Sequence, residues 1–231
     1  MSLSRIGRLV LVFTAITACS DADGPTRPDP NAAAVVIANL ATGTSDVDVV
    51  VTGLTNPVAI DLDFGFYTSQ CALLPAGQEI TIDFSSGGTL LASEDVVLDV
   101  GELYTILLTS DGTTEHALVL KDDVNIPAGQ RAVRLVNATL DEGDVYIFPE
   151  GEAMGDAAAT DLPYAATAAQ PPQYLLRADE QTVVRFFEPG VSLGDPRAEQ
   201  SLPPADIAPA ATVIFAEEEG ALEVFALGPC F

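Results

Sequence analysis

The chain has few basic residues, no tryptophan and a single histidine. Its 231 residues include 9 lysines and arginines against 34 aspartates and glutamates, which gives a formal net charge of −25. Because binding to phosphates requires clustered positive charge, this balance excludes a nucleic-acid-binding protein. It also argues against attachment to an anionic membrane through a basic face. The apolar content of 48% is ordinary for globular proteins, so the chain has enough apolar side chains for a folded core.

The chain also lacks an apolar run long enough to cross a membrane. One uncharged, mostly apolar run, residues 9–18 (LVLVFTAITA), follows Arg5 and Arg8 near the N-terminus. Ten residues rise about 15 Å as a helix, which is half the thickness of a bilayer core. This pattern predicts a secretory signal peptide over residues 1–18.

The signal segment closes with residues 16–19 (ITAC), a tetrapeptide that resembles the lipobox of bacterial lipoproteins. The resemblance implies cleavage before Cys19, lipidation of that residue, and anchoring to a lipid bilayer through its acyl chains. An ordinary secretory signal with an unrelated cysteine is the alternative. Residues 19–33 are rich in proline and lack apolar periodicity, so we expect a flexible tether. The lipidated cysteine is followed by Ser20 rather than aspartate, which favours the outer membrane of the bacterial cell envelope.

The remaining sequence predicts short β-strands separated by turns every 8–12 residues, the spacing typical of a β-sandwich. Residues 79–84 (EITIDF) alternate apolar and polar side chains, and residues 46–51, 103–108 and 115–120 also have strand character. Ser110-Asp111-Gly112 joins the last two as a hairpin turn. The alanine-rich residues 157–159 and 165–169 are interrupted by prolines, so we expect a loop there.

An internal repeat is the most informative feature of the sequence. Three segments recur in the same order, at offsets of 98, 102 and 107 residues. The matched segments are 34–39 with 133–137, 73–84 with 175–186, and 105–108 with 212–215. A chance alignment of β-patterned segments is the alternative. The repeat predicts two modules, residues 34–125 and 126–231.

Most of residues 34–150, the first module and the start of the second, resemble a bacterial family, the domain-of-unknown-function family 4397. The resemblance rests on residues 134–138 (RLVNA), 141–147 (DEGDVYI), 74–77 (LPAG), 101–105 (GELYT) and 120–123 (LKDD). After residue 150 the second module departs from the pattern, with residues 176–179 (LRAD) in place of LPAG. The resemblance implies immunoglobulin-like folding, an envelope location and no established activity. We therefore expect an all-β protein of two tandem immunoglobulin-like antiparallel β-sandwich domains.

The three cysteines suggest one disulfide bond. If Cys19 carries lipid, Cys71 and Cys230 remain as a pair in an oxidising compartment. Their bond would join the first module to the end of the second. Free thiols, or a bond to a partner protein, are the alternatives, because the separation of the two residues cannot be read from the sequence.

The sequence gives little support for catalysis or for a cofactor. His116 is the only histidine, so no second histidine can share acid–base catalysis with it. It lies in the alternating pattern of a predicted strand, which favours a structural or surface role over catalysis. No motif for a nucleophile, phosphate or zinc is present. Calcium is the one cofactor worth considering, but none of the acidic groups has the spacing of a calcium-binding loop. Those groups are Asp46/Asp48, Asp61/Asp63, Asp122/Asp123 and residues 217–219.

The features of the sequence favour a lipid-anchored structural, interaction or adhesion module without enzymatic activity, whose partner is an unknown envelope protein or extracellular ligand. A protein that binds a glycan or calcium is the alternative. Glycans stack on exposed aromatic rings, and the candidates in loops are Tyr67, Tyr164 and Tyr174. Asn39 and Asn137, at equivalent strand ends, are expected to bond their own turns rather than a ligand.

Overall fold

The computed structural model of the chain describes residues 31–139, 141, 143–150, 158–165, 171–190, 196–218 and 220–229. The regular structure of these residues consists of β-strands arranged in four four-stranded sheets, which confirms the predicted all-β fold with β-sandwiches. The described residues include no helix that is long and apolar enough to cross a membrane. The predicted signal peptide, Cys19 and Cys230 lie outside the described residues.

Residues 32–121 form the first sheet pair. Sheet A has the strand order β4-β1-β7-β8, and sheet B has the order β3-β2-β5-β6. Strands β1 and β7 are parallel, whereas the other neighbours are antiparallel. The strands are β1 (Ala32–Leu40), β2 (Val47–Val51), β3 (Ala59–Leu62), β4 (Ala72–Pro75), β5 (Glu79–Ser86), β6 (Thr89–Val97), β7 (Leu103–Ser110) and β8 (Glu115–Lys121).

Residues 130–227 form the second sheet pair with the same topology. Sheet C has the order β12-β9-β15-β16, and sheet D has the order β11-β10-β13-β14. Again one pair of neighbours, β9 and β15, is parallel. The strands are β9 (Gln130–Asn137), β10 (Gly143–Pro149), β11 (Ala159–Leu162), β12 (Tyr174–Ala178), β13 (Gln181–Phe187), β14 (Ala198–Ser201), β15 (Ala210–Glu218) and β16 (Ala221–Leu227).

Strand registers relate the two sheet pairs residue by residue. Ala34 pairs with Leu103 in sheet A, and Ala132 pairs with Ala210 in sheet C, at the offsets of 98 and 107 residues found in the sequence. One part of the sequence alignment is wrong by a residue. Leu73 pairs with Ala34 and Leu176 with Ala132, so Leu73 is equivalent to Leu176 and not to Leu175. The turn after this strand is therefore one residue shorter in the second sheet pair.

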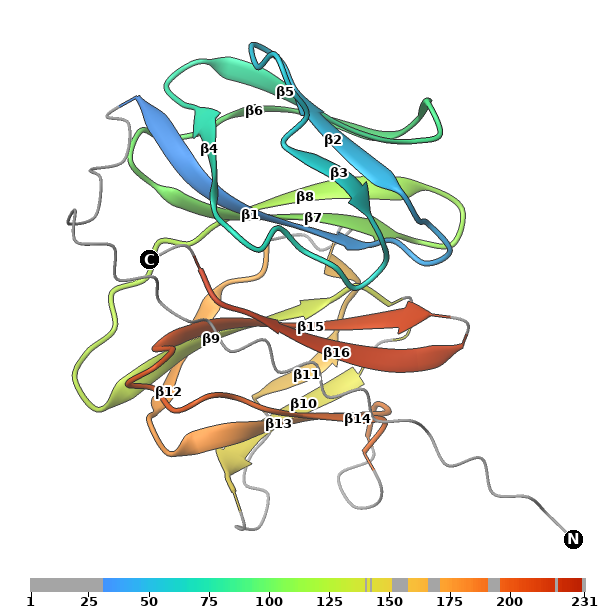
Figure 1. Cartoon of the computed structure of the whole chain (residues 1–231). Coiled ribbons are helices and arrows are strands. Elements are labelled where there is room, and N and C mark those ends of the chain that lie inside the picture. Colours follow the sequence, from blue (N-terminus) through green and yellow to red (C-terminus); the bar gives the residue numbers. More distant parts are fainter. Residues whose placement is uncertain are drawn as a thin grey trace, which may run out of the picture.

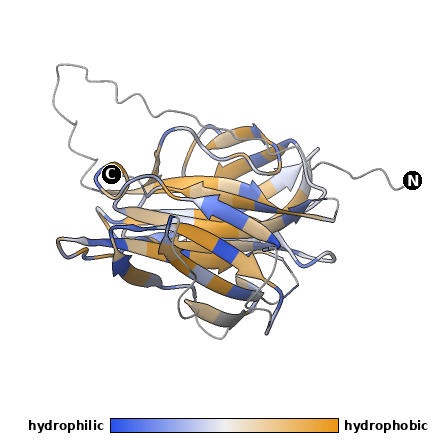
Figure 2. Cartoon of the chain, turned by 90° about the horizontal axis from the view of Figure 1, so that it is seen from below, coloured by the Kyte–Doolittle hydropathy of each residue, from blue (hydrophilic) through white to orange (hydrophobic). Residues whose placement is uncertain are grey.

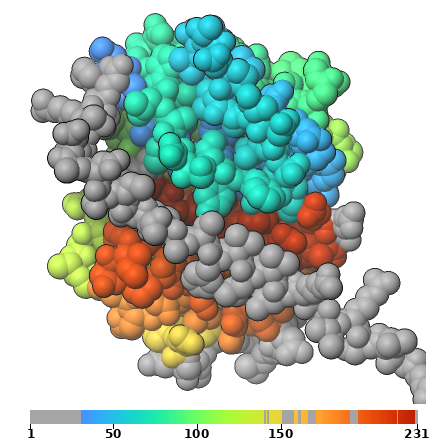
Figure 3. Space-filling view, viewed as in Figure 1, coloured from blue at the N-terminus to red at the C-terminus, as the bar shows by residue number. Residues whose placement is uncertain are grey.

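The four sheets are stacked in the order B, A, C, D, as Figure 1 shows from top to bottom. One apolar core lies between sheets B and A, and another between sheets C and D. A third core lies between sheets A and C. Figure 2 shows that many strand positions within the stack are hydrophobic. In the space-filling view the first sheet pair, cyan and green, rests directly on the second, orange and red (Figure 3).

The strand patterns read from the sequence explain these layers. In β5 the side chains of Ile80, Ile82 and Phe84 are buried, as their alternation predicts. The predicted hairpin turn joins β7 to β8, where Asp111 N donates to Thr114 O at 3.1 Å. The loop expected around residues 157–159 is partly wrong, because Ala159 begins β11 and pairs with Val145 of β10.

Candidate functional site

Sheets A and C are each buried on both faces, and the faces that meet form the junction between the sheet pairs. In β7, Ile106 and Leu108 pack in the core of the first sheet pair, whereas Leu107 faces the junction. In β15, Val213 packs between sheets C and D, whereas Ile214 faces the junction. Strands buried on both faces have nearly continuous apolar sequences, as these two strands do.

An ion pair lies at the centre of the polar part of the junction. Arg134 extends from β9, and its Nη2 donates to Oδ1 of Asp122, which follows β8, at 2.5 Å. The two side chains are only 1% and 0% exposed. Two charges this deeply buried are tolerated only where further hydrogen bonds satisfy their remaining groups.

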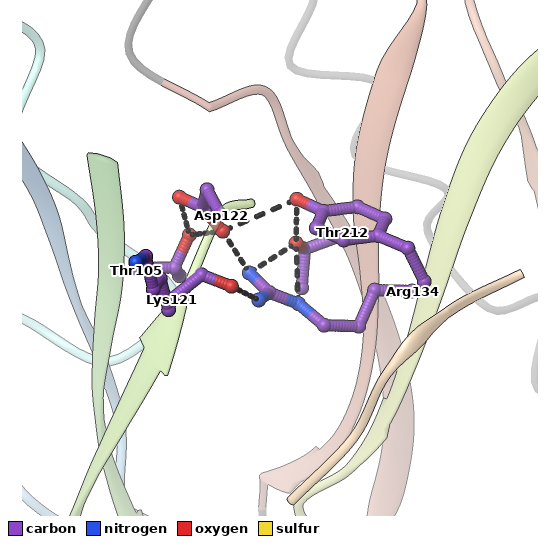
Figure 4. A network of polar contacts seen from close by, with 6 residues as sticks. Thr105, Lys121, Asp122, Arg134 and Thr212 are labelled. Atoms are coloured by element: carbon purple, nitrogen blue, oxygen red, sulfur yellow. Dashed lines mark hydrogen bonds and ion pairs between the residues drawn. The ribbon is translucent and has the colours of Figure 1, made fainter. Parts of the chain in front are cut away.

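Neighbouring groups supply those hydrogen bonds. Arg134 Nε and Nη2 donate to Thr212 Oγ1 at 3.1 and 2.8 Å, and Nη1 donates to Lys121 O at 3.1 Å. Thr105 Oγ1 donates to Asp122 Oδ2 at 2.9 Å, so both carboxylate oxygens are bonded. Figure 4 shows these groups converging from both sheet pairs. We call Thr105, Asp122, Arg134, Tyr174 and Thr212 the junction network.

Tyr174 closes the junction network on one side. Its hydroxyl donates to Asp122 Oδ1 at 3.2 Å, and the Arg134 guanidinium lies 4.6 Å from the centre of its ring. Burial of the hydroxyl raises the pKa of Tyr174 to about 12. The side chain is therefore a neutral hydrogen-bonding group at physiological pH.

Two aromatic contacts flank the junction on its opposite edges. On one edge, the Tyr164 hydroxyl lies 3.0 Å from Thr109 Oγ1, and the Tyr164 ring meets the His116 ring edge-on at 6.1 Å. On the other edge, Phe64 meets Phe225 edge-on at 5.9 Å. His116 also lies 3.3 Å from Asp111 Oδ2, so its contacts are those of a packing residue at the junction.

Asn39 and Asn137 organise turns at the ends of equivalent strands. Asn39 Nδ2 donates to Leu62 O, and its Oδ1 accepts from Ala41 N. Asn137 Nδ2 donates to Leu162 O in the same way, and its Oδ1 accepts from Thr139 N. Both side chains are buried, and these bonds agree with the turn role predicted for them.

Three of the carboxylates considered for calcium, those of Asp48, Asp63 and Asp122, accept other hydrogen bonds in the structure. Asp122 belongs to the junction network. Asp48 Oδ1 accepts from Asp61 N at 3.2 Å, and Asp63 Oδ1 accepts from Asp46 N at 3.3 Å, so these four residues stabilise the β2–β3 hairpin. Among the described residues, no group of three or more histidine, cysteine, aspartate or glutamate side chains could hold a metal ion.

The structure describes only one of the two cysteines of the predicted disulfide bond. Cys71, which precedes β4, is disulfide-bonded. Because Cys19 and Cys230 both lie outside the described residues, the pairing of Cys71 with Cys230 stays a prediction.

Two of the three tyrosines considered as a glycan platform are not available for stacking. Tyr164 is 7% exposed, and Tyr174 lies within the junction network. Tyr67 is 42% exposed, and the adjacent Phe66, which the sequence analysis did not single out, is 64% exposed.

Comparison with known proteins identifies the family. The family described as "Domain of unknown function (DUF4397)" matches residues 24–148. The chain belongs to this family. The match includes the first sheet pair and the start of the second, where β9 carries Arg134. None of the curated proteins compared with the chain matches it.

Two solved structures from streptococci are similar to this DUF4397 protein at low scores. One is titled "Alpha-glucan binding by a streptococcal virulence factor"; it is 13% identical, with a TM-score of 0.27, over 83% of this chain and 95% of that chain. The other is titled "Alpha-glucan recognition by family 41 carbohydrate-binding modules from streptococcal virulence factors". It is 12% identical, with a TM-score of 0.29, over 83% of this chain and 96% of that chain. Neither similarity is high enough to carry an inference about this chain.

The segments that carry the DUF4397 resemblance supply three members of the junction network. Arg134 opens the RLVNA segment, Asp122 lies in the LKDD segment, and Thr105 ends the GELYT segment. From the sequence, these residues are markers of the family, Asp122 is also a candidate calcium ligand, and no contact among them is predicted. A charged residue within an otherwise apolar strand was the available signal, since such a residue is seldom buried without a partner.

Proposed function

We propose that this protein is a lipid-anchored, non-catalytic structural or interaction module of the bacterial cell envelope, built from two tandem β-sandwiches that act as one rigid unit. The junction carries this proposal. An apolar core shared by sheets A and C, and a buried ion pair with its hydrogen bonds satisfied, oppose any hinge between the sheet pairs. A rigid unit suits a protein that presents a binding surface of fixed shape at the end of a flexible tether.

The N-terminal sequence supports the proposed anchor. A short apolar segment with two arginines before it and Cys19 at its end favours export and lipidation. The proline-rich residues 19–33 would then separate the sheet pairs from the bilayer. The placement in the outer membrane rests on Ser20 and is part of the same proposal.

Equivalent registers support the tandem arrangement. Both sheet pairs have the same strand order, one parallel neighbour each, and offsets that match the sequence repeat. Duplication of a β-sandwich of about 100 residues explains these features together, with module limits near residues 34–125 and 126–231.

Labelling of cells with a radioactive fatty acid tests the anchor. We expect label in the wild-type protein and none in Cys19→Ala, which should leave the membrane fraction. Label retained by Cys19→Ala would overturn the proposed anchor.

For the interaction role, cross-linking in intact cells followed by purification should recover one envelope component with the wild-type protein, in stoichiometric amount. Turnover of a substrate by the purified protein would overturn the non-catalytic role.

A further inference from the structure

Exposed apolar side chains lie together on one side of the first sheet pair. Strand β3 is an edge of sheet B, strand β4 is an edge of sheet A, and both lie against β1, so the two edges share one side of the sandwich (Figure 1). We call residues 60–73, which connect and include parts of these edges, the edge segment. Its exposed large apolar side chains are those of Ile60, Phe66, Tyr67 and Leu73. Apolar side chains that are exposed together, rather than singly, are typical of a surface that contacts a partner.

Hydrogen bonds hold the two aromatic residues of the edge segment in place. Phe66 O accepts from Asn39 N at 3.0 Å, and Phe66 N donates to Asp63 O at 3.1 Å. Tyr67 pairs with Ala38 of β1 in an antiparallel bridge. The two rings therefore extend from an ordered backbone, and a partner can bind them without the cost of ordering a loop.

The aromatic pair lies far along β1 from the proposed anchor. Strand β1 begins at Ala32, directly after the tether, and Asn39, which bonds to Phe66, comes seven residues later. At 3.3 Å per residue this separation is about 23 Å. The pair is thus well separated from the point where the tether joins the fold, which leaves it accessible to a partner.

The first sheet pair offers no basic side chain to an anion. Residues 34–120 contain 12 aspartates and glutamates, and neither lysine nor arginine. Asp61 and Asp63 belong to the edge segment and are exposed. Lys121, the first basic residue after this range, pairs with Asp99 at 2.9 Å. The edge segment is therefore negatively charged, and the complementary partner is cationic.

The same charge argues against other occupants of the edge segment. A second copy of the chain would bring an equal negative charge to it, and an anionic bilayer would also be repelled. Residues 19–30 of the tether contain three aspartates and one arginine, so the tether is not complementary either. A lysine or arginine side chain of another protein, by contrast, pairs with a carboxylate and is also attracted to the face of an aromatic ring.

We propose that the edge segment is the docking surface for an envelope protein, and that it binds a segment in which arginine or lysine alternates with apolar side chains. The basic groups of the partner pair with Asp61 and Asp63 and stack on Phe66 and Tyr67, while its apolar side chains cover the neighbouring apolar positions. This inference rests on the proposed interaction role and adds the location of the surface and the chemistry of the partner.

Fluorescence anisotropy with labelled octapeptides tests this surface on the full chain with Cys19→Ser. The probe alternates arginine with leucine. One comparison peptide has glutamate in place of arginine, and the other has serine in place of leucine. At physiological ionic strength we expect the probe to bind with a Kd of about 100 μM or tighter. Each comparison peptide should bind at least about tenfold more weakly, because one lacks the positive charge and the other lacks the apolar contact.

Variants of the edge segment locate the binding. Phe66→Ala should weaken binding of the probe by about tenfold, because it truncates an aromatic anchor. The double variant Asp61→Asn/Asp63→Asn should also weaken it and reduce its dependence on salt. Leu90→Ala and Glu94→Gln change exposed positions of β6, the opposite edge of sheet B, and as matched controls should bind normally. Since every changed side chain is exposed, the Tm of each variant should stay within about 2 °C of the wild type.

Several results would overturn the proposal. They are no binding of the probe, equal binding of the serine peptide, and binding that Phe66→Ala leaves unchanged. The last two would indicate unspecific attraction to an acidic protein. Binding of maltotriose or cellotriose that Phe66→Ala abolishes, without binding of the probe, would indicate a glycan site instead and would also overturn it.

Cross-linking in cells separates this surface from the interaction role itself. Phe66→Ala should lose the envelope component recovered with the wild-type protein and should keep the fatty-acid label. If Phe66→Ala still recovers that component, the proposed surface is wrong and the interaction role stands. If the wild-type protein recovers no component, the interaction role is wrong, and the peptide measurements still decide whether the edge segment binds basic segments.

Discussion

At the scale of single residues, β9 carries two buried arginines whose surroundings differ. Arg134 is paired with Asp122, and all three of its side-chain nitrogens donate hydrogen bonds. Arg131, three residues earlier on the opposite face, has two nitrogens without a partner among the described residues. The same residue type therefore has all its nitrogens bonded at the junction and only one of them bonded between sheets C and D, among the described residues.

Replacement of Arg134 should destabilise the protein strongly. Arg134→Met leaves the Asp122 carboxylate buried without its charge partner, which costs about 3–5 kcal/mol in the free energy of unfolding. The double variant Arg134→Met/Asp122→Leu should recover most of this loss, since no charge then remains buried. Urea denaturation measures both values. Arg197→Met is the control, because its surface pair with Asp141 contributes less than about 1 kcal/mol. A double variant no more stable than Arg134→Met would contradict the role of the pair.

Stability should fall as the pH rises from about 10 to 12. The folded-state pKa of Tyr174 is raised to about 12 by burial, whereas tyrosine in the unfolded chain ionises near pH 10. The stabilisation is thus fully present below pH 10 and is lost as the pH approaches the folded-state pKa. Urea denaturation at several pH values should show a shallower alkaline decline for Tyr174→Phe. An unchanged slope would show that Tyr174 is not buried as described.

At the scale of elements, strand identity was predictable and sheet stacking was not. Alternation located β5, and the repeat located equivalent strands because side chains in a strand have a period of two. The same period explains why the sequence alignment of β4 with β12 is wrong by one residue. Each strand contains two adjacent leucines, and either alignment places one leucine of each pair on the inner face of the sheet. The junction depends on contacts between distant strands, such as Arg134 with Asp122 and Phe64 with Phe225, and no local pattern encodes these.

At two equivalent core positions the sheet pairs differ in side-chain size, and the two differences have opposite signs. Gly143 stands where the first pair has Val47, and Phe215 stands where it has Leu108. The Phe186 ring packs 4.7 Å from the Phe215 ring and occupies the space beside Gly143, where an added Cβ would lie 2.1 Å from the Phe186 Cζ atom. The small residue therefore accommodates the additional ring.

Gly143→Ala should accordingly lower stability. The new methyl group overlaps the Phe186 ring, and such overpacking typically costs about 1–3 kcal/mol. Gly228→Ala is a matched control, because an added Cβ there meets nothing within 4 Å. Thermal unfolding of the two variants provides the comparison. Equal Tm values for both variants would contradict the packing described for sheet D.

At the scale of the whole molecule, negative charge is distributed along the chain rather than concentrated in a tail. The tether at residues 19–33 contains 3 acidic residues, residues 34–125 contain 14, and residues 126–231 contain 17. Mutual repulsion of like charges keeps such a protein soluble and opposes self-association. The junction, by contrast, is apolar with one neutralised ion pair, so the charge does not oppose contact between the sheet pairs.

The predicted Cys71–Cys230 bond would reinforce this arrangement. It would tie the segment before β4 to the end of the chain and close a very long loop, for which chain entropy predicts a stabilisation of about 4–5 kcal/mol. Mass spectrometry of peptides from the unreduced protein should find these two cysteines cross-linked. A Cys71–Cys19 peptide, or a free thiol on Cys230, would contradict the pairing.

The rigid junction is the central claim, and residual dipolar couplings test it most directly. Backbone couplings from the weakly aligned full chain with Cys19→Ser report the orientation of each sheet pair independently. If the sheet pairs form one rigid unit, a single alignment tensor fits the couplings of residues 32–121 and 130–227 together. Two tensors of different magnitude or orientation would show motion between the sheet pairs and would contradict the account.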